Sequence, residues 1–383
     1  MTRERQRANG EGDVYARRNA KGRIIGYRGS YWVQTSEGPK RRYVSGKNKG
    51  ETRKALAKAR GNRDAGLFFD AGNLTLQQYL ERWLEDSVRG SVGHRTYHNY
   101  RSQARNHLIP MLGRVKLRAI SPAHVQGLYS SKLESGLSTA SVRYQHAVLH
   151  RALKQATRWG LVPSNVCDAV DPPKVVTKEI TPLTPEQTRT FLRAAKGDRY
   201  EAIYVLAVSC GLREGELLGL MRSDADLDAR TLRIERQLQR RRDGGGLHYP
   251  DPKHGSKRTI KLPKKVAEAL SEHLTIQRQE IRKAGSLYVD QGLMFASDTG
   301  TPLDAQNVVN RSFKPLLRRA DLPSIRFHDL RHTCATLLLM QNVHPKFVQT
   351  LLGHKSITIT LDLYSHWIED MGDFTADAMD EIL

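Results

Sequence analysis

The chain has 383 residues, 39% of them hydrophobic, which is enough apolar material for two or three folded domains and argues against disorder of the whole chain. Its 62 Lys and Arg residues outnumber 40 Asp and Glu residues, and the formal net charge of +22 favours a polyanionic partner such as nucleic acid. The absence of a long apolar run, of an apolar signal core and of paired cysteine motifs argues against a membrane or secreted protein and predicts a cytoplasmic one with reduced thiols.

The first 70 residues are strongly basic, with 18 Lys and Arg residues against 7 Asp and Glu residues. The segment GRIIGYRGSYWVQT, followed by KRRYVSG, places large apolar residues among polar ones and predicts a small antiparallel sheet. Residues 51–60, ETRKALAKAR, predict a short helix. A basic sheet with one helix suits a DNA groove, and the alternative is a solvated charged face. We predict a DNA-binding domain over residues 1–65.

The next region, after a glycine-rich linker, carries only helical signals. Thr75 and Gln78 have the spacing of a capping box, and they precede an apolar stripe of Leu76, Tyr79, Leu80, Trp83 and Leu84. Further helices are predicted over residues 95–108, 122–133 and 139–159. We predict a compact four-helix domain over residues 74–170, and a charged, proline-containing linker over residues 171–180 that joins it to the last region.

The last region, residues 180–383, combines helices with short strands. Thr184, Pro185 and Gln187 together predict the start of a helix. Helical patterns dominate afterwards and are interrupted by two strand-like segments, TLRIERQL and RTIKL. The predicted fold class is therefore a multidomain protein, mainly α with small β-sheets, whose last domain is mixed α/β.

Four short stretches of this last region supply cations, imidazoles and a tyrosine. They are CGLREGEL with Arg213 and Glu216, DPKHGSKRTIKL with Lys253, FHDLRHTCATLLL with His328 and Arg331, and LLGHKSITITLDLYSH with His354 and Tyr364. His328 and Arg331 are three residues apart, so both leave one helix face. Lys253 is expected at the start of a β-hairpin.

This set of residues suits attack on a phosphodiester. Two arginine forks can hold the non-bridging phosphate oxygens, where each donor contributes about 10²–10³ in rate. Nearby cations favour the phenolate form of a tyrosine, and a lysine or histidine can protonate the departing alkoxide. The resulting phosphotyrosine ester keeps the energy of the broken bond, so rejoining needs no ATP, cofactor or metal.

Each motif alone has a simpler interpretation. Glu216 is expected to orient Arg213 without doing chemistry. Lys257 and Arg258 lie in the same segment as Lys253 and compete for its role. His332 is expected to be structural, and the role of His366 is left open between structure and function. Each motif taken singly is weak evidence for a function, but the combination of all of them in this order is specific.

That order, GLRxxE, a lysine, HxLRH, LGH and then a tyrosine, resembles the tyrosine recombinase (phage integrase) family over residues 182–367. The resemblance implies that Tyr364 is a nucleophile that forms a 3′-phosphotyrosine and frees a 5′-hydroxyl. Arg213 and Arg331 would form the phosphate clamp, and Lys253 would be the general acid. His328 would be a phosphate ligand and proton-transfer partner, and His354 a further ligand of the scissile phosphate.

The resemblance extends to the domains and their partners. The four-helix region, with its phrase HLIPMLGRVKL, is similar to the core-binding domain, and the basic N-terminal region is similar to an arm-type DNA-binding domain. Double-stranded DNA, at core and arm-type sites, and a homotetramer on DNA would be the partners, with a DNA-bending host protein and a directionality factor as possible additions. The acidic tail after Tyr364 would pack on a neighbouring subunit.

The function expected from this resemblance is site-specific recombination that integrates a mobile element through a Holliday junction, and whether the protein also excises the element is left open. Two alternatives stay open: a DNA-relaxing topoisomerase with a similar site, and a non-catalytic DNA-binding regulator on the same fold. The protein would be cytoplasmic and associated with the nucleoid when bound to DNA. The attachment sites, the cleavage spacing and the kind of mobile element do not follow from the sequence.

Overall fold

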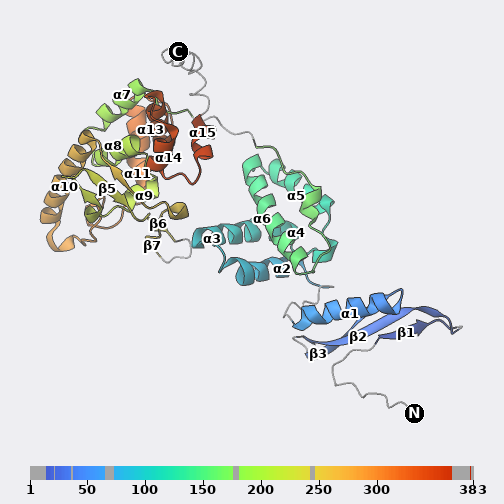
Figure 1. Ribbon diagram of the computed structural model, residues 1–383. Coiled ribbons are helices and arrows are strands. Elements are labelled where there is room, and N and C mark those ends of the chain that lie inside the picture. The colour runs from blue at the N-terminus through green and yellow to red at the C-terminus, as the bar shows by residue number, and fades with distance from the viewer. Residues whose placement is uncertain are drawn as a thin grey trace. The chain divides into compact units, whose positions relative to one another are not determined.

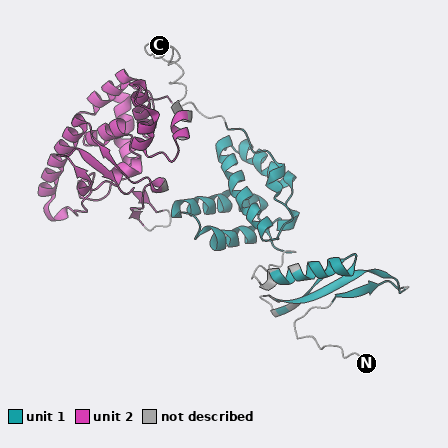
Figure 2. Cartoon of the chain, viewed as in Figure 1, with its two compact units in different colours: residues 1–176 teal, residues 177–383 magenta. Residues whose placement is uncertain are grey.

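The computed structural model describes residues 14–20, 22–35, 38–64, 73–175, 181–241, 246–364 and 380. The chain divides into two compact units, residues 1–176 and residues 177–383 (Figure 2). Residues 176–180 of the predicted linker, and residues 365–379 and 381–383 of the predicted acidic tail, lie outside the described residues.

The first unit begins with a three-stranded antiparallel sheet covered on one face by a helix (Figure 1). The strands are β1 (Val14–Arg18), β2 (Ile24–Thr35) and β3 (Gly38–Gly46), and the helix is α1 (Lys49–Asp64). Alternate residues of β2, Tyr31 and Val33, pack against Leu56 of α1 because successive strand side chains point to opposite faces. The predicted basic sheet with one helix is confirmed, and the helix is longer than residues 51–60.

The rest of the first unit is helical. Its helices are α2 (Leu76–Trp83), α3 (His94–Gln103), α4 (Ile109–Leu112), α5 (Pro122–Glu134) and α6 (Thr139–Arg158). The predicted capping box is present, because Thr75 Oγ1 accepts from the Gln78 amide at 3.3 Å and Gln78 Oε1 accepts from the Thr75 amide at 3.0 Å. The predicted stripe on α2 is buried in a core that also receives one face of α6.

Two π-helical turns interrupt this region, η1 (Leu84–Val88) and η2 (Ala104–Leu108). The predicted helix over residues 95–108 is therefore not a uniform α-helix, since its second half has π-helical pairing. Short 3₁₀ turns, η3 (Leu117–Ala119) and η4 (Val166–Ala169), complete the unit. A π-helical turn contains one residue more than an α-helical turn and so shifts the helix face on which the following side chains lie. In η2 both Ala104 and Leu108 remain buried.

The second unit consists of helices and a small antiparallel sheet packed around one large hydrophobic core. Its helices are α7 (Pro185–Ala195), α8 (Glu201–Cys210), α9 (Glu214–Leu218), α10 (Lys264–Ala284), α11 (Ala305–Val308), α12 (Lys314–Arg319), α13 (Asp329–Met340), α14 (Pro345–Leu352) and α15 (Ile357–Tyr364). Helix α8 is the central one and packs against α7, α10 and α13. The helices α13, α14 and α15 pack one against the next (Figure 1).

The sheet has the order β4 (Ala225–Asp226), β5 (Thr231–Ile234) and β8 (Arg258–Lys261). A separate hairpin joins β6 (Gln239–Arg240) to β7 (Leu247–His248). The remaining turns are η5 (Arg222–Asp224), η6 (Lys253–Gly255), η7 (Gly285–Leu287) and the π-helical η8 (Val309–Phe313). This mixture of helices and small sheets confirms the predicted fold class. No helix among the described residues is long and apolar enough to cross a bilayer.

Candidate active site

The motif GLRxxE forms a tight junction between α8 and α9. Gly211 ends α8 with a left-handed backbone, φ +62°, and a Cβ there would lie 2.3 Å from Leu352 Cδ2. Glycine alone fits such a position without strain. Cys210, the residue before it, is buried. The reversal places Arg213 at the start of α9 and Glu216 one turn later, where its carboxylate accepts from the Arg213 amide at 3.1 Å.

Glu216 is the anionic centre of the site and is 0% exposed. Its Oε1 accepts from Arg213 Nη1 at 2.6 Å, and its Oε2 accepts from Arg258 Nη2 at 2.9 Å. Burial by itself raises the pKa of a carboxyl, but the hydrogen bonds and charges of Arg258 and then Arg213 outweigh it and lower the pKa of Glu216. The carboxylate is therefore ionised and holds two guanidinium groups, which agrees with the predicted orienting role.

Arg331, on the first turn of α13, is only 3% exposed. Its Nη1 donates to the Gly211 carbonyl and its Nη2 to the Leu352 carbonyl, both at 2.7 Å. The planar guanidinium thus joins the end of α8 to the end of α14. A lysine ammonium group could not make this connection, because it lacks two parallel donors. His328 and His332 lie on the same helix face, with ring centroids 5.2 Å apart in an edge-to-face arrangement.

The last turn of α14 holds three arginines through three consecutive main-chain carbonyls. Leu351 O accepts from Arg258 Nε at 2.7 Å, Leu352 O from Arg331 Nη2 at 2.7 Å, and Gly353 O from Arg213 Nη2 at 3.1 Å. The carbonyls at a helix C-terminus lack helical partners and carry partial negative charge, so cations are favoured there. Gly353 has a left-handed backbone, φ +66°, which turns the chain at this point.

His354 follows this turn and is half-buried next to the arginines. Its Nδ1 lies 2.9 Å from Thr360 Oγ1 on α15, which fixes the ring. Burial, followed by the charges of Arg331 and Arg213, lowers the pKa of His354 to about 4. Burial of the ring and the neighbours His332 and Arg331 lower the pKa of His328 to about 4 as well, although the residue as a whole is exposed. Both imidazoles are neutral at pH 7 and so can accept a proton.

These lowered pKa values predict a stability that falls in mild acid. The unfolded chain protonates its histidines near about pH 6.5, whereas the folded site resists protonation until about pH 4. Between these two values the unfolded state binds more protons, so the free energy of unfolding decreases as the pH falls. Denaturant unfolding of the chain at pH 7 and pH 5 is expected to show this loss, and His354→Gln is expected to reduce the difference. If His354→Gln loses as much stability between pH 7 and pH 5 as the wild type, the lowered pKa of His354 is contradicted.

Lys253 is exposed and lies in the turn η6, between β7 and β8. The prediction that it starts a β-hairpin is wrong in detail, because the hairpin β6–β7 precedes it and β8 pairs with β5 instead. The turn nevertheless belongs to the site, since Ser256 Oγ accepts from Arg213 Nη1 at 3.3 Å. The competing Lys257 is bound to Asp251 at 2.9 Å.

Tyr364 is the last residue of α15, the helix that begins three residues after His354. Its side chain, and His366 beyond it, lie outside the described residues. The structure therefore brings together Arg213, Glu216, His328, Arg331 and His354, places the Lys253 segment beside them, and ends α15 at Tyr364.

The sequence did not predict the roles of two residues of the site: Arg258 is a partner of Glu216, and Thr360 is a partner of His354. Arg258 meets residues 42 and 93 positions away in the chain, so no local pattern separates it from a surface arginine. Thr360 lies six residues after His354 and is fully buried, which a threonine in an apolar helical run could have suggested.

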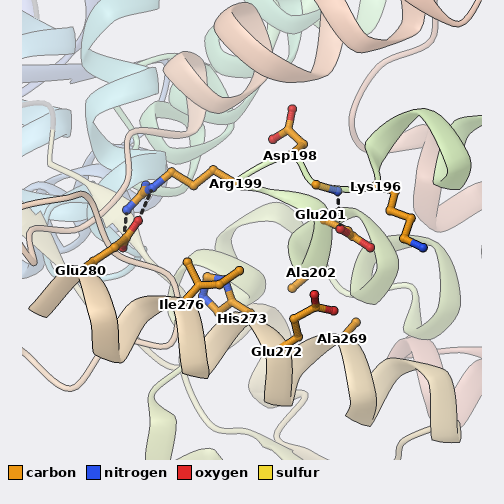
Figure 3. Close-up of a pocket in the computed structure, with 11 residues that line it drawn as sticks. Lys196, Asp198, Arg199, Glu201, Ala202, Ala269, Glu272, His273, Ile276 and Glu280 are labelled. Atoms are coloured by element: carbon orange, nitrogen blue, oxygen red, sulfur yellow. Dashed lines mark hydrogen bonds and ion pairs between the residues drawn. The ribbon is translucent and has the colours of Figure 1, made fainter.

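A separate cavity of about 400 Å³ lies between the α7–α8 turn and α10 (Figure 3). It contains none of the predicted site residues. Its charged groups are largely engaged within the protein, since Arg199 binds Glu280 through two hydrogen bonds and Glu201 accepts from the Gly197 amide at 2.7 Å. The arginine and histidine cluster, and not this cavity, is the candidate active site.

Comparisons with known proteins identify the family of the chain. The pattern of the phage integrase family matches residues 182–370, and that of the phage integrase N-terminal SAM-like domain matches residues 75–133. A XerC-like tyrosine recombinase of Caldanaerobacter subterraneus subsp. tengcongensis is 32% identical, over 79% of this chain and 82% of that protein. An integrase of Saccharopolyspora erythraea is 28% identical, over 94% of this chain and 97% of that protein.

A solved structure is also similar. The Tn1549 transposon integrase, in complex with a circular intermediate DNA, superposes with a TM-score of 0.69 at 25% identity, covering 81% of this chain and 100% of that one. The two family patterns thus include residues 75–133 of the helical region and the whole arginine cluster of the second unit. The chain therefore belongs to the phage integrase family of tyrosine recombinases, enzymes that act on DNA.

Proposed function

We propose that this protein is a site-specific DNA recombinase that breaks and rejoins strands through a 3′-phosphotyrosine intermediate, and that it integrates and excises a mobile element. The observation that carries the proposal is the pair of guanidinium groups of Arg213 and Arg331, anchored on the adjacent carbonyls of Gly353 and Leu352. Two fixed forks beside neutral imidazoles suit a phosphodiester that gathers negative charge.

In the proposed reaction, the phenolate oxygen of Tyr364 attacks the scissile phosphorus. The bond from phosphorus to the 5′ oxygen breaks, and Lys253 gives a proton to that oxygen, which leaves as a hydroxyl. His328 accepts the phenolic proton, Arg213 and Arg331 hold the non-bridging oxygens, and His354 binds the same phosphate. Attack by another 5′-hydroxyl on the phosphotyrosine reverses these steps and joins a new strand, so neither ATP nor a metal is required.

We propose a division of labour among three domains: an arm-type DNA-binding domain at residues 1–65, a core-binding domain at residues 74–170 and a catalytic domain at residues 180–383. Two DNA-binding domains on one chain raise affinity through effective concentration. The partners are double-stranded DNA and further copies of this chain in a tetramer, and a DNA-bending host protein and a directionality factor are additional candidates. The acidic tail packs on a neighbouring copy, and the protein acts in the cytoplasm on nucleoid DNA.

The face of the N-terminal sheet opposite α1 is the proposed arm-type surface. Arg28 stacks on Tyr43 with its guanidinium carbon 4.0 Å from the ring centroid, and Arg41 donates to Ser30 Oγ at 3.0 Å. Trp32, which is 51% exposed, is paired across the strands with Arg41. Aromatic rings that hold arginines in fixed positions suit contacts with DNA phosphates and base edges.

Replacing Arg28 and Arg41 together by alanine is expected to weaken binding to arm-type DNA by about 10–100-fold, because two contacts that release counterions are lost. The slope of log affinity against log salt is expected to fall by about two, and cleavage at the core site is expected to persist. Fluorescence anisotropy at several salt concentrations measures both quantities. Lys54→Ala, on the exposed side of α1, is the matched control, and an equal loss in the control would contradict this choice of face.

The proposed function is tested by covalent capture. The chain is incubated with candidate DNA that includes nicked fragments, the protein is denatured, and any DNA that remains attached is sequenced. Attachment at one clustered sequence is expected. Plasmid relaxation at many sequences would favour a topoisomerase instead, and tight binding without attachment would favour a regulator.

A further inference from the structure

Arg258, the first residue of β8, is a third arginine of the site, and its side chain is 8% exposed. Its Nη2 and Nη1 donate to the two oxygens of Glu216 at 2.9 and 3.3 Å. Its Nε donates to Leu351 O at 2.7 Å, and its Nη1 also reaches Ser256 O at 3.1 Å. These four hydrogen bonds use four of the five N–H groups of the guanidinium, so little of the fork of Arg258 is left to hold a phosphate.

The acceptors of Arg258 are shared with the two arginines of the proposed clamp. Glu216 Oε1 accepts from both Arg213 Nη1 and Arg258 Nη1. The next two carbonyls after Leu351 accept from Arg331 and Arg213. Arg258 therefore connects the buried carboxylate of α9 to the end of α14, from which the chain continues into α15.

We propose that Arg258 is a positioning residue for strand cleavage: by tying Glu216 to the last turn of α14, it fixes the guanidinium of Arg213 and the segment that leads to Tyr364. This inference rests on the proposed function, because it concerns the same phosphate. It differs from that proposal in assigning a role to a residue that touches neither the phosphate nor the reacting oxygens.

The physical reason lies in the preferred geometry of arginine and carboxylate. A carboxylate with one arginine partner favours two parallel hydrogen bonds from it. Here Arg258 takes up much of the capacity of Glu216, and Arg213 uses Nη1 on the carboxylate while its Nη2 reaches Gly353. Without Arg258, Arg213 is expected to turn fully onto Glu216 and withdraw from the phosphate, while the end of α14 loses one of its three anchors.

The substrate for the test is the DNA sequence recovered by covalent capture. It carries a nick, so that the cleaved product is trapped, and cleavage by the full chain is measured in single-turnover reactions. Wild-type cleavage tests the proposed function, and the ratio of variant to wild type tests Arg258. Arg258→Ala is expected to cleave about 10²–10³-fold more slowly. Arg258→Lys is expected to recover part of this loss, since an ammonium can pair with Glu216 but cannot also reach Leu351. DNA affinity is expected to change by less than about threefold, because Arg258 contacts no DNA.

Lys261→Ala is the matched control, because Lys261 is an exposed cation on the same strand. Thermal melting reports whether each variant folds, and if Arg258→Ala does not fold, Arg258→Lys decides the question. Cleavage by the folded variants at rates within about twofold of wild type would overturn the inference.

A substrate with sulfur in place of the 5′ bridging oxygen separates positioning from acid catalysis, since a thiolate leaves without a proton. The Arg258→Ala defect is expected to persist with this substrate; its rescue would mean that Arg258 is the general acid and would overturn the positioning role. In an Arg213→Lys background, removing Arg258 is expected to slow cleavage by a smaller factor than in the wild type, because the part of its effect that acts through Arg213 is already lost and only the part that acts through the end of α14 remains. A full, additive loss there would also overturn the inference.

Discussion

Replacing Tyr364 by phenylalanine is expected to abolish covalent attachment to DNA while leaving DNA binding near its wild-type strength. Phenylalanine keeps the ring and removes only the oxygen that forms the bond to phosphorus. The loss is expected to be at least about 10⁴-fold, because the remaining donors can stabilise charge but cannot supply a nucleophile. The measurement is the fraction of labelled DNA that migrates with denatured protein, together with affinity from fluorescence anisotropy.

Tyr288→Phe is the matched control for this prediction. Tyr288 lies in the same unit, in the loop after η7, and its loss removes the same atom from a part of the chain outside the candidate site. The control is expected to attach DNA as wild type does. Attachment by the Tyr364→Phe protein would mean that another tyrosine is the nucleophile.

Replacing Arg331 by alanine is expected to slow cleavage by about 10²–10³-fold, because one fork of the phosphate clamp is lost. The same change leaves the buried carbonyls of Gly211 and Leu352 without their donor, which costs about 1–3 kcal/mol for each group. A lower melting temperature is therefore expected together with the slower reaction. Arg331→Lys keeps the charge but cannot serve both carbonyls, so it is expected to show a smaller loss of stability and a similar loss of rate.

Single-turnover cleavage and thermal melting measure these two effects separately. Arg189→Ala is the control for the change in charge, since Arg189 is exposed on α7 and pairs only locally with Glu186 at 2.6 Å. A rate for Arg331→Ala within about threefold of wild type, in a folded protein, would remove Arg331 from the clamp.

The elements that the sequence predicted well are those set by local chemistry. The helices predicted to start after Thr75 and Thr184, and the helix predicted from residue 122, start where predicted because each cap, the last being Ser121, bonds within its own first turn. The apolar stripe of α2 is buried as its spacing requires. The same holds for part of the site, since Glu216 meets Arg213 across a single turn of α9.

The features that the sequence did not predict depend on distant parts of the chain. The strand TLRIERQL ends at Ile234, four residues before Leu238, because β5 is only as long as the partner it finds in β8. The π-helical turns and the buried position of Arg258 likewise follow from packing between segments. A sequence pattern could nominate Arg258 as a cation near Lys253, but not as the second partner of a carboxylate on α9.

The anchoring of three arginines on the last turn of α14 has a consequence for how the site tolerates mutation. The acceptors at Leu351, Leu352 and Gly353 are main-chain oxygens, so they are present whatever side chains occupy these positions. Substitutions at the two leucines put packing at risk but cannot delete an acceptor. The glycine is different, because an added Cβ would lie 3.0 Å from Arg258 Nη1 on a left-handed backbone. In a saturation mutagenesis experiment, many side-chain substitutions along this turn should therefore leave the arginines aligned. The alignment should be lost where a substitution alters the path of the backbone itself.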